Sequence, residues 1–364
     1  MAKKWKTALT NAFLRGYVAL THHLKKGEAV TSQHEFSSIV VYSTTALGDL
    51  MFNTPAIAAI RKRYPSAYIT LISSHKNRAL VEESSCFNEV IYWDEKVRDI
   101  RPVIQTIRKN KAELAVILHS KPPYDILSAV LGGCRYIMKD VYGDSLSGLE
   151  ALLAHPVQPF DGHLIQRKLN LVALLGCDIA NHEMFIPVAF PVIDKHPEKI
   201  RIGFQMGASG EKRCWPVPKF ITLAKSLLAQ GPNYEIVLIG TSKEKHLETQ
   251  FFASLTPEER TQVVSYIDKT GLKQLLGIMK NMDVLVTGDT GPLHLAIALK
   301  TKTVSLFVTA NPRYTGPYQD ARLHQVIYIE PQDAGIKAEQ RFPLDVISAE
   351  RVYALIKEMM SEKM

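Results

Sequence analysis

The stretch that decides the fold spans residues 282–296 and reads MDVLVTGDTGPLHLA. Its apolar run, Val284 to Val286, leads into a turn that contains two glycines, and Pro292 stands where a helix would begin. Proline is favoured at the first position of a helix, because no backbone N–H is needed there as a donor. The stretch therefore predicts a strand, a tight turn and a helix in succession.

The start of this helix suits an anion. The N–H groups of a first helical turn have no partner within the helix, and the helix dipole adds partial positive charge at that end. Together with the Thr290 hydroxyl and His294, these groups predict a site for a diphosphate. The same pattern is also that of an ordinary strand-to-helix turn, capped by Asp289 or Thr290.

The order strand, loop, helix recurs on both sides of this stretch. Before residue 186 we predict strands at 39–42, 68–72, 90–93, 114–118 and 135–138, and helices at 50–63, 77–83, 99–110, 124–131 and 162–175. After residue 198 we predict strands at 200–205, 235–239, 284–286, 303–308 and 326–328, and helices at 219–229, 243–253, 272–280, 292–299 and 349–360. Short β-rich runs that alternate with longer amphipathic segments indicate parallel sheets covered by helices.

The length of the chain, 364 residues, exceeds what one hydrophobic core usually serves, so two domains are expected. We predict an α/β fold of two Rossmann-like, doubly wound domains at 37–185 and 199–345, joined by a proline-marked linker at 186–198. The closing helix, 346–364, can pack back on the first domain. Two such domains that face each other across a cleft indicate a two-lobed transferase of the GT-B architecture, or else a two-domain dehydrogenase or binding protein.

The composition is that of a globular protein with an anionic partner. Hydrophobic residues make up 46% of the chain and charged residues 22%. A formal charge of +8 and a pI near 9.1 indicate nucleic acid, phospholipid or a phosphorylated substrate, without choosing among them. The four cysteines form no C-x-x-C pair, which argues against a zinc site or a disulfide framework. Since the sequence has neither a membrane-spanning apolar run nor a signal-peptide core, a cytoplasmic protein is expected.

Residues 1–36 form a basic extension with an amphipathic pattern. On a helix, one apolar face would consist of Trp5, Leu9, Phe13, Tyr17 and Leu20. The basic residues beside it are Lys3, Lys4, Lys6, Arg15, Lys25 and Lys26. Such a helix can lie on an anionic membrane surface, or it can pack on the protein as an additional helix.

A second stretch, residues 40–55, reads VVYSTTALGDLMFNTP. Asp49 follows a glycine at the carboxyl end of the predicted strand, where the next helix begins. In doubly wound folds this position lies at the mouth of the ligand-binding crevice. Asp49 can therefore cap the helix, or act as a general base on an acceptor hydroxyl, or do both.

Two further loops follow predicted strands of the second domain. Residues 207–216, GASGEKRCWP, place Lys212 and Arg213 on a glycine-containing loop, where adjacent cations can hold phosphate oxygens as a nucleotide departs. A solvated basic loop is the plainer interpretation. Residues 309–318, TANPRYTGPY, indicate a loop rich in turns and no more.

Together these stretches resemble one family, glycosyltransferase family 9, the lipopolysaccharide heptosyltransferases. The resemblance runs from about residue 39 to the carboxyl terminus, and its most specific parts are 288–296 and 47–49. It implies an inverting, metal-independent transfer of a heptose from ADP-heptose to the inner core of lipopolysaccharide or lipooligosaccharide. The acceptor would be an anionic lipid of the lipid A–Kdo type, reached from the cytoplasmic face of the inner membrane. The resemblance implies no cofactor other than this donor substrate, and the sequence has no Asp-x-Asp pair to hold a metal-bound diphosphate.

The resemblance also assigns roles to individual residues. Asp49 would be the catalytic base, and a cation two residues before the Trp-Pro pair would stabilise the leaving diphosphate. Family members have lysine there, whereas this chain has Arg213 with Lys212 beside it, so either can take that role. The expected donor-binding residues are Gly207, Ser209, Gly240, Glu244, Asp289, Thr290, Gly291, Pro292 and His294. The expected acceptor-binding residues are Thr44, Thr45, Gly48, His119 and Lys121, and no metal ligand is expected.

Some features depart from the family pattern or leave alternatives open. Ser43 stands where many members carry a basic residue, and the extension 1–36 lies outside the family core. Another nucleotide sugar can be the donor, because nothing in the sequence identifies the base or the heptose. A Rossmann dehydrogenase is disfavoured, since no G-x-G-x-x-G follows the first strand of either domain. A non-catalytic sugar-binding or nucleic-acid-binding protein is disfavoured because the basic residues are spread widely, without aromatic residues between them.

Overall fold

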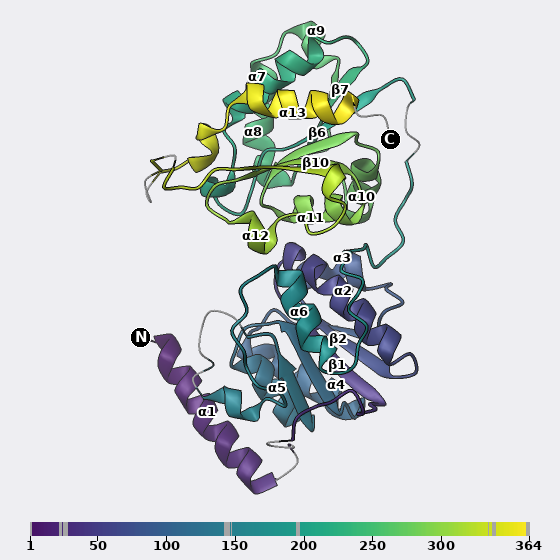
Figure 1. Cartoon of the computed structure of the whole chain (residues 1–364), viewed down its shortest axis with the longest axis vertical. Coiled ribbons are helices and arrows are strands. Elements are labelled where there is room, and N and C mark those ends of the chain that lie inside the picture. The colour runs from purple at the N-terminus through teal and green to yellow at the C-terminus, as the bar shows by residue number, and fades with distance from the viewer. Residues whose placement is uncertain are drawn as a thin grey trace. The chain divides into compact units, whose positions relative to one another are not determined.

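The computed structural model divides into two compact units, Met1–Val188 and Ala189–Met364 (Figure 1). It describes residues 2–21, 24, 28–141, 146, 148–193, 197–333, 335–336 and 340–361, and the side chains of residues 2–7 are left aside. Two residues of the predicted basic extension, Lys25 and Lys26, therefore lie outside the described residues, as do the side chains of Lys3, Lys4, Trp5 and Lys6. The division falls within the stretch 186–198 in which the sequence has its predicted linker.

The first unit is built on a parallel sheet with the strand order β3-β2-β1-β4-β5. Its strands are β1 (Ser38–Ser43), β2 (Tyr68–Ser73), β3 (Glu89–Tyr92), β4 (Leu114–His119) and β5 (Tyr136–Lys139). Its helices are α1 (Ala2–Thr21), α2 (Leu47–Arg63), α3 (Arg78–Val81), α4 (Ile100–Lys109), α5 (Tyr124–Gly132) and α6 (Leu164–Ala173). Three short 3-10 helices span His75–Asn77, Val97–Asp99 and Leu149–Leu152. Every residue of β1 is buried, as expected of a central strand that is covered on both faces.

The second unit has a parallel sheet with the order β11-β10-β9-β6-β7-β8. Its strands are β6 (Ile200–Gln205), β7 (Tyr234–Ile239), β8 (Val263–Ser265), β9 (Val284–Gly288), β10 (Lys302–Phe307) and β11 (His324–Tyr328). Its helices are α7 (Val217–Leu228), α8 (Lys245–Ala253), α9 (Pro257–Arg260), α10 (Leu272–Lys280), α11 (Gly291–Ala298), α12 (Pro312–Thr315) and α13 (Ala349–Ser361). Its 3-10 helices span Glu211–Arg213, Ser242–Glu244, Ala321–Leu323 and Pro343–Val346. The predicted class, two α/β domains with parallel sheets, is confirmed.

In each sheet the direction of strand addition reverses between two neighbouring strands. In the first sheet these neighbours are β1 and β4, and in the second they are β6 and β9. The loops that leave such strands turn to opposite faces of the sheet, which opens a crevice at their carboxyl ends. Asp49 follows β1 and His119 ends β4, while Asp289 follows β9 and the loop 207–213 follows β6. The topology thus gathers the predicted site residues of each unit at one edge of its sheet.

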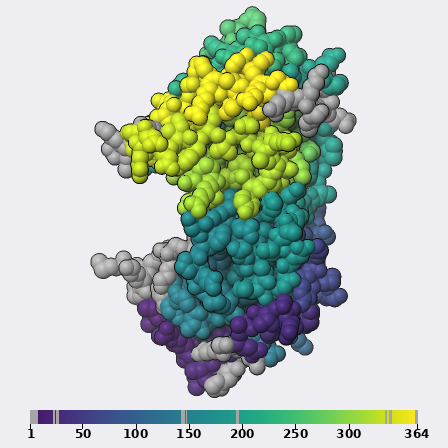
Figure 2. Space-filling view, in the orientation of Figure 1, coloured from purple at the N-terminus to yellow at the C-terminus, as the bar shows by residue number. Residues whose placement is uncertain are grey.

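Helix α1 packs on the first unit, as one of the two interpretations of the sequence expected, but only part of the predicted apolar face takes part in this packing. Leu14 and Val18 are buried in the core of this unit, where α1 contacts α5. By contrast, Leu9, Phe13 and Leu20 of the predicted apolar face are 59%, 54% and 84% exposed. Figure 2 shows α1, in purple, at the surface of this unit. The helix therefore has two apolar stripes: Tyr17 of the predicted face packs against the core, whereas Leu9, Phe13 and Leu20 form the outer stripe.

The closing helix α13 belongs to the second unit. It buries Ala349, Val352, Ile356 and Met359 in the core that it shares with α7. The expectation that it can pack back on the first domain is therefore replaced, because its apolar face is occupied within its own unit. Strand β8 and the one-turn helices α9 and α12 were not predicted, since such short elements show no full period of apolar residues.

The inner stripe of α1 provides a test of this packing. Leu14→Ala should lower the free energy of unfolding of the first unit by about 2 to 5 kcal/mol, because it removes a fully buried leucine side chain. The control Leu9→Ala alters an exposed leucine of the same helix, and its effect should stay within about 0.5 kcal/mol. Urea denaturation followed by circular dichroism measures both. Equal losses in the two variants would show that the helix packs through another face.

Candidate active site

Asp49 lies in the first turn of α2, directly after β1. Its Oδ2 accepts the backbone N–H of Ala46 at 3.1 Å, so the carboxylate stabilises the start of the helix from within the first turn. The side chain is 28% exposed, which leaves part of the carboxylate open to solvent. The geometry is therefore compatible with both roles that the sequence allowed, the stabilisation of the helix and the acceptance of a proton.

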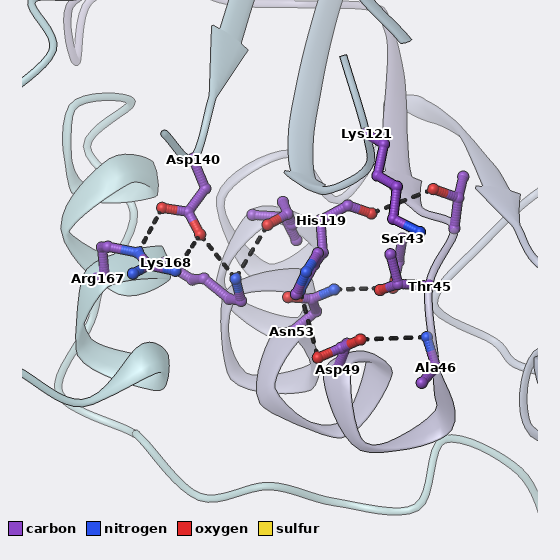
Figure 3. Close-up of polar contacts among 12 residues, drawn as sticks. Ser43, Thr45, Ala46, Asp49, Asn53, His119, Lys121, Asp140, Arg167 and Lys168 are labelled. Carbon is purple, nitrogen blue, oxygen red and sulfur yellow. Dashed lines mark hydrogen bonds and ion pairs between the residues drawn. The ribbon is translucent and has the colours of Figure 1, made fainter. Parts of the chain in front are cut away.

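His119 faces Asp49 from the end of β4. Its Nδ1 lies 3.6 Å from Oδ1 of Asp49 (Figure 3). Burial first, and the positive charge of Lys168 second, lower the pKa of His119 to about 4. The imidazole is therefore neutral near pH 7.

Three charged side chains form a buried ion cluster behind this pair. Lys168 of α6 is fully buried, and its Nζ donates to the carbonyl oxygen of Leu118 at 3.0 Å and to Oδ2 of Asp140 at 2.8 Å. Arg167 donates two hydrogen bonds to the same carboxylate, at 2.7 and 3.0 Å. Burial raises the pKa of Asp140, but the two cations lower it more, so this carboxylate stays ionised. None of the three residues was predicted from the sequence.

The predicted acceptor-binding residues lie at the same edge of the sheet, where Glu95 connects two of them. The Thr44 hydroxyl donates to Oε1 of Glu95 at 2.7 Å. The backbone N–H of Lys121 donates to the same oxygen at 2.9 Å, and its Nζ lies 3.5 Å from Oε2. Thr45 is held through its carbonyl oxygen, which accepts from Nδ2 of Asn77, and Gly48 lies in the first turn of α2. Glu95 was not predicted; its positive φ of 61° is the kind of local feature that an isolated sequence does not reveal.

In the second unit, Asp289 joins two of the predicted donor-site residues. Nη2 of Arg213 lies 3.7 Å from Oδ2 of Asp289, and its Nη1 donates to the Asp289 carbonyl oxygen at 3.4 Å. Nε2 of His294 lies 3.8 Å from Oδ1 of Asp289. At the start of α11, Thr290 occupies the N-cap position without a side-chain capping bond, and its hydroxyl lies 3.0 Å from that of Thr287. The Thr290 side chain thus makes no capping bond to the first turn of α11, contrary to the capping interpretation for that residue.

A large hollow opens within the second unit, beside the loop 207–216. It has a volume of about 990 Å³, and three residues expected to bind the donor, Gly207, Ser209 and Glu244, are among those that line it. A smaller hollow of about 580 Å³ also borders Ser209 and is lined by Lys212, Arg213 and Arg341. Arg341, whose guanidinium pairs with Glu211 at 2.6 Å, lines both hollows and was not predicted.

Three of the expected donor-binding residues, Glu244, Gly207 and Gly240, also have a structural role. The Glu244 carboxylate accepts the backbone N–H of Thr241 at 2.6 Å and its hydroxyl at 2.7 Å. A Cβ on Gly207 would lie 2.4 Å from Cγ of Glu244, and one on Gly240 would lie 3.1 Å from its Cβ. Both glycines therefore make room for the Glu244 side chain at the wall of the hollow.

Comparison with known proteins identifies the family. The model of glycosyltransferase family 9 (heptosyltransferase) matches residues 141–343, more than half of the chain.

The chain belongs to glycosyltransferase family 9.

Its relatives include lipopolysaccharide heptosyltransferase 2 of Escherichia coli strain K12, which is 23% identical over 308 residues that cover 77% of this chain and 85% of the relative. The crystal structure of a family 9 glycosyl transferase from Veillonella parvula superposes with a TM-score of 0.75 at 21% identity, covering 92% of this chain and 100% of the other. The structure of the E. coli ADP-heptose lps heptosyltransferase II superposes with a TM-score of 0.71 at 22% identity, covering 89% of this chain and 98% of the other. These structures confirm the GT-B class of fold.

The described part of this family 9 glycosyltransferase contains no helix that is long and apolar enough to cross a membrane. In the same residues, no group of three or more His, Cys, Asp or Glu side chains is arranged to hold a metal ion.

Gly288 allows the close approach of the two loops in the second unit of this glycosyltransferase. A Cβ at this position would lie 2.6 Å from the carbonyl oxygen of Arg213. Gly288→Ala should therefore push the 211–214 turn away from β9, lower the melting temperature and speed amide exchange at Arg213 and Cys214. The control is Gly210→Ala in the same loop, where a Cβ would meet nothing within 4 Å. Hydrogen-exchange mass spectrometry measures the effect, and unchanged exchange in the Gly288 variant would disprove the close approach.

Proposed function

We propose that this enzyme transfers a heptose from ADP-heptose to the inner core of lipopolysaccharide or lipooligosaccharide, by an inverting reaction that needs no metal ion. The observation that carries the proposal is the constellation of Arg213, Asp289 and His294 at the start of α11, with Arg213 also lining a hollow of about 580 Å³. A nucleotide site commonly has a volume of roughly 300 to 1,000 Å³. The relatives are named as heptosyltransferases, which supports heptose as the sugar that is transferred. One of the similar solved structures is that of an ADP-heptose lps heptosyltransferase, which supports ADP-heptose as the donor.

The cations of the second unit would neutralise the diphosphate. Lys212, Arg213 and Arg341 surround the smaller hollow, and the guanidinium of Arg213 lies within reach of the Asp289 carbonyl at the end of β9. The N–H groups at the start of α11 add positive potential on the same side. Because Arg213 contacts Asp289 just before α11, we assign the principal contact with the leaving ADP to Arg213.

Asp49 would act as the base. As the acceptor hydroxyl attacks the anomeric carbon, its proton passes to the Asp49 carboxylate, a new glycosidic bond forms, and the bond to the diphosphate oxygen breaks with its electron pair leaving on ADP. Entry of the acceptor on the side opposite the leaving group inverts the configuration. The partial exposure of Asp49 supports this role, because the proton donor must be able to reach the carboxylate.

Asp49→Asn tests the assignment of the base. Asparagine keeps the shape of the side chain and some capping ability, but it cannot take the proton. Turnover should fall by about a hundredfold or more, with ADP affinity and melting temperature near those of the wild type. Asp99→Asn, which alters an exposed carboxylate of the same unit, should leave turnover unchanged. If Asp49→Asn kept turnover within a few fold of wild type when chemistry limits the rate, Asp49 would be a structural residue only.

Helix α1 would bring the enzyme to the anionic cytoplasmic surface of the inner membrane. Its outer stripe, Leu9, Phe13 and Leu20, is exposed, while the inner stripe anchors the helix to the first unit. The extension is rich in lysine and the whole chain carries a formal charge of +8, which favours a negatively charged lipid surface. Such contact would place the enzyme where its lipid acceptor is.

Replacement of the outer stripe tests this contact. The triple variant Leu9→Ser, Phe13→Ser, Leu20→Ser should reduce cosedimentation with phosphatidylglycerol vesicles by about tenfold or more, because each buried apolar side chain contributes on the order of 1 kcal/mol or more. Its melting temperature should stay near that of the wild type. The control Val192→Ser alters a valine that is 83% exposed elsewhere, and it should bind as the wild type does. Undiminished vesicle binding by the triple variant would rule out this surface.

A further inference from the structure

We propose that Arg341 binds the diphosphate of the donor, and that this diphosphate takes the place of the Glu211 carboxylate on the Arg341 guanidinium. The inference rests on the proposed function, because it needs a donor that carries a diphosphate. It goes beyond the assignment of Arg341 to the cations of the second unit, since it names Glu211 as the group that the diphosphate displaces. Glu211 is thus a competitor for the ligand that is built into the chain.

Two hydrogen bonds join Arg341 to Glu211. Nε donates to Oε2 at 2.8 Å, and Nη2 donates to Oε1 at 2.6 Å. A guanidinium binds a phosphate group in the same way, with two parallel N–H donors that face two oxygens. Glu211 therefore occupies an edge of the Arg341 guanidinium that also fits a phosphate group.

Both residues line the two hollows of the second unit. The smaller hollow is also lined by Lys212 and Arg213, so three cations border it. Among the described residues that line this hollow, Glu211 is the one carboxylate. A diphosphate carries more negative charge than the Glu211 carboxylate, which can balance one of these cations at most. The charge around this hollow thus favours the diphosphate.

The chain beside Arg341 is anchored independently of Glu211. Arg341 precedes the 3-10 helix Pro343–Val346, whose Leu344 is buried in the core of the second unit. Nε1 of Trp215 donates to the carbonyl oxygen of Ile347 at 3.0 Å, and Trp215 is 2% exposed. This buried hydrogen bond ties the segment to the end of the loop 207–216. The guanidinium therefore stays beside the smaller hollow when it exchanges one partner for another.

The exchange costs little because the pair is accessible to water. The side chains of Arg341 and Glu211 are 69% and 56% exposed. Exposed ion pairs contribute little to stability, since water screens the charges and both side chains lose freedom. The hydrogen bond from Arg341 lowers the pKa of Glu211, so its carboxylate is charged near pH 7 and competes with the diphosphate as an anion. Its release leaves this charge in solvent and not in an apolar interior.

A double-mutant cycle in ADP affinity tests the exchange. Isothermal titration calorimetry with ADP, in buffer without added metal, compares the full wild-type chain with Glu211→Gln, Arg341→Gln and the combination of both. Glu211→Gln should tighten ADP binding by about threefold to tenfold, because it removes the competing partner and a like charge beside the phosphates. Arg341→Gln should weaken binding by about threefold alone, but by about tenfold or more in combination with Glu211→Gln. The loss is larger in the combination because the guanidinium no longer has to leave Glu211 first.

Two exposed residues of α13 serve as matched controls. Glu358→Gln and Arg351→Gln make the same changes of charge in the same unit, and neither residue lines either hollow. Both variants should bind ADP as the wild type does. Since all of these substitutions alter exposed side chains, the melting temperatures should stay near that of the wild type.

The sign of the coupling decides the result. If Glu211→Gln weakened ADP binding, and Arg341→Gln then cost less in combination with it, Glu211 would position Arg341 for the ligand and the exchange would be ruled out. An equal cost of Arg341→Gln alone and in combination would also rule it out, while the donor site at Asp289 and His294 would stand. If the wild type bound no ADP, the proposed function would fail first.

Discussion

The parallel order of the strands is the constraint on which the rest of the structure depends. In each sheet, two adjacent central strands send their loops to opposite faces, β1 and β4 in one unit and β6 and β9 in the other. Only at such a point do the carboxyl ends of neighbouring strands leave room for a ligand. Asp49 and His119 face each other because β1 pairs with β4. Arg213 reaches Asp289 because β6 pairs with β9 and because Gly288 lets the two loops approach.

The two units use positive charge in different ways. In the second unit the cations are accessible: the side chains of Arg213 and Arg341 are 47% and 69% exposed, and both border a hollow. Such groups can bind phosphate oxygens directly. In the first unit Lys168 is fully buried and Lys139 nearly so, and each is paired with a buried carboxylate, Asp140 and Asp125 respectively. The accessible cations can meet a charged ligand, whereas the buried pairs belong to the interior of the first unit.

The sequence was enough to predict the class of fold and the two strand-to-helix segments that follow β1 and β9. Buried parallel strands are short, continuous apolar runs, and the turns after β1 and β9 carry their glycine and aspartate within a few residues. The buried ion cluster could not be predicted from the sequence, because Asp140 and Lys168 are 28 positions apart and neither lies in a recognisable local motif. Arg341 was missed for the same reason, since it reaches the loop 207–216 from 130 residues away. That α1 packs on the protein was one of the two interpretations of the sequence, but periodicity alone could not tell which of its apolar residues face the core.

We propose that ADP-heptose is the donor of this enzyme. The most direct measurement is incubation of the purified full chain with ADP-heptose, UDP-glucose and other nucleotide sugars, each together with truncated core oligosaccharides, followed by mass spectrometry of the products. The account predicts the addition of one heptose with ADP-heptose and no product with the other donors. Turnover with a different nucleotide sugar, or binding of ADP without turnover of any donor, would contradict it.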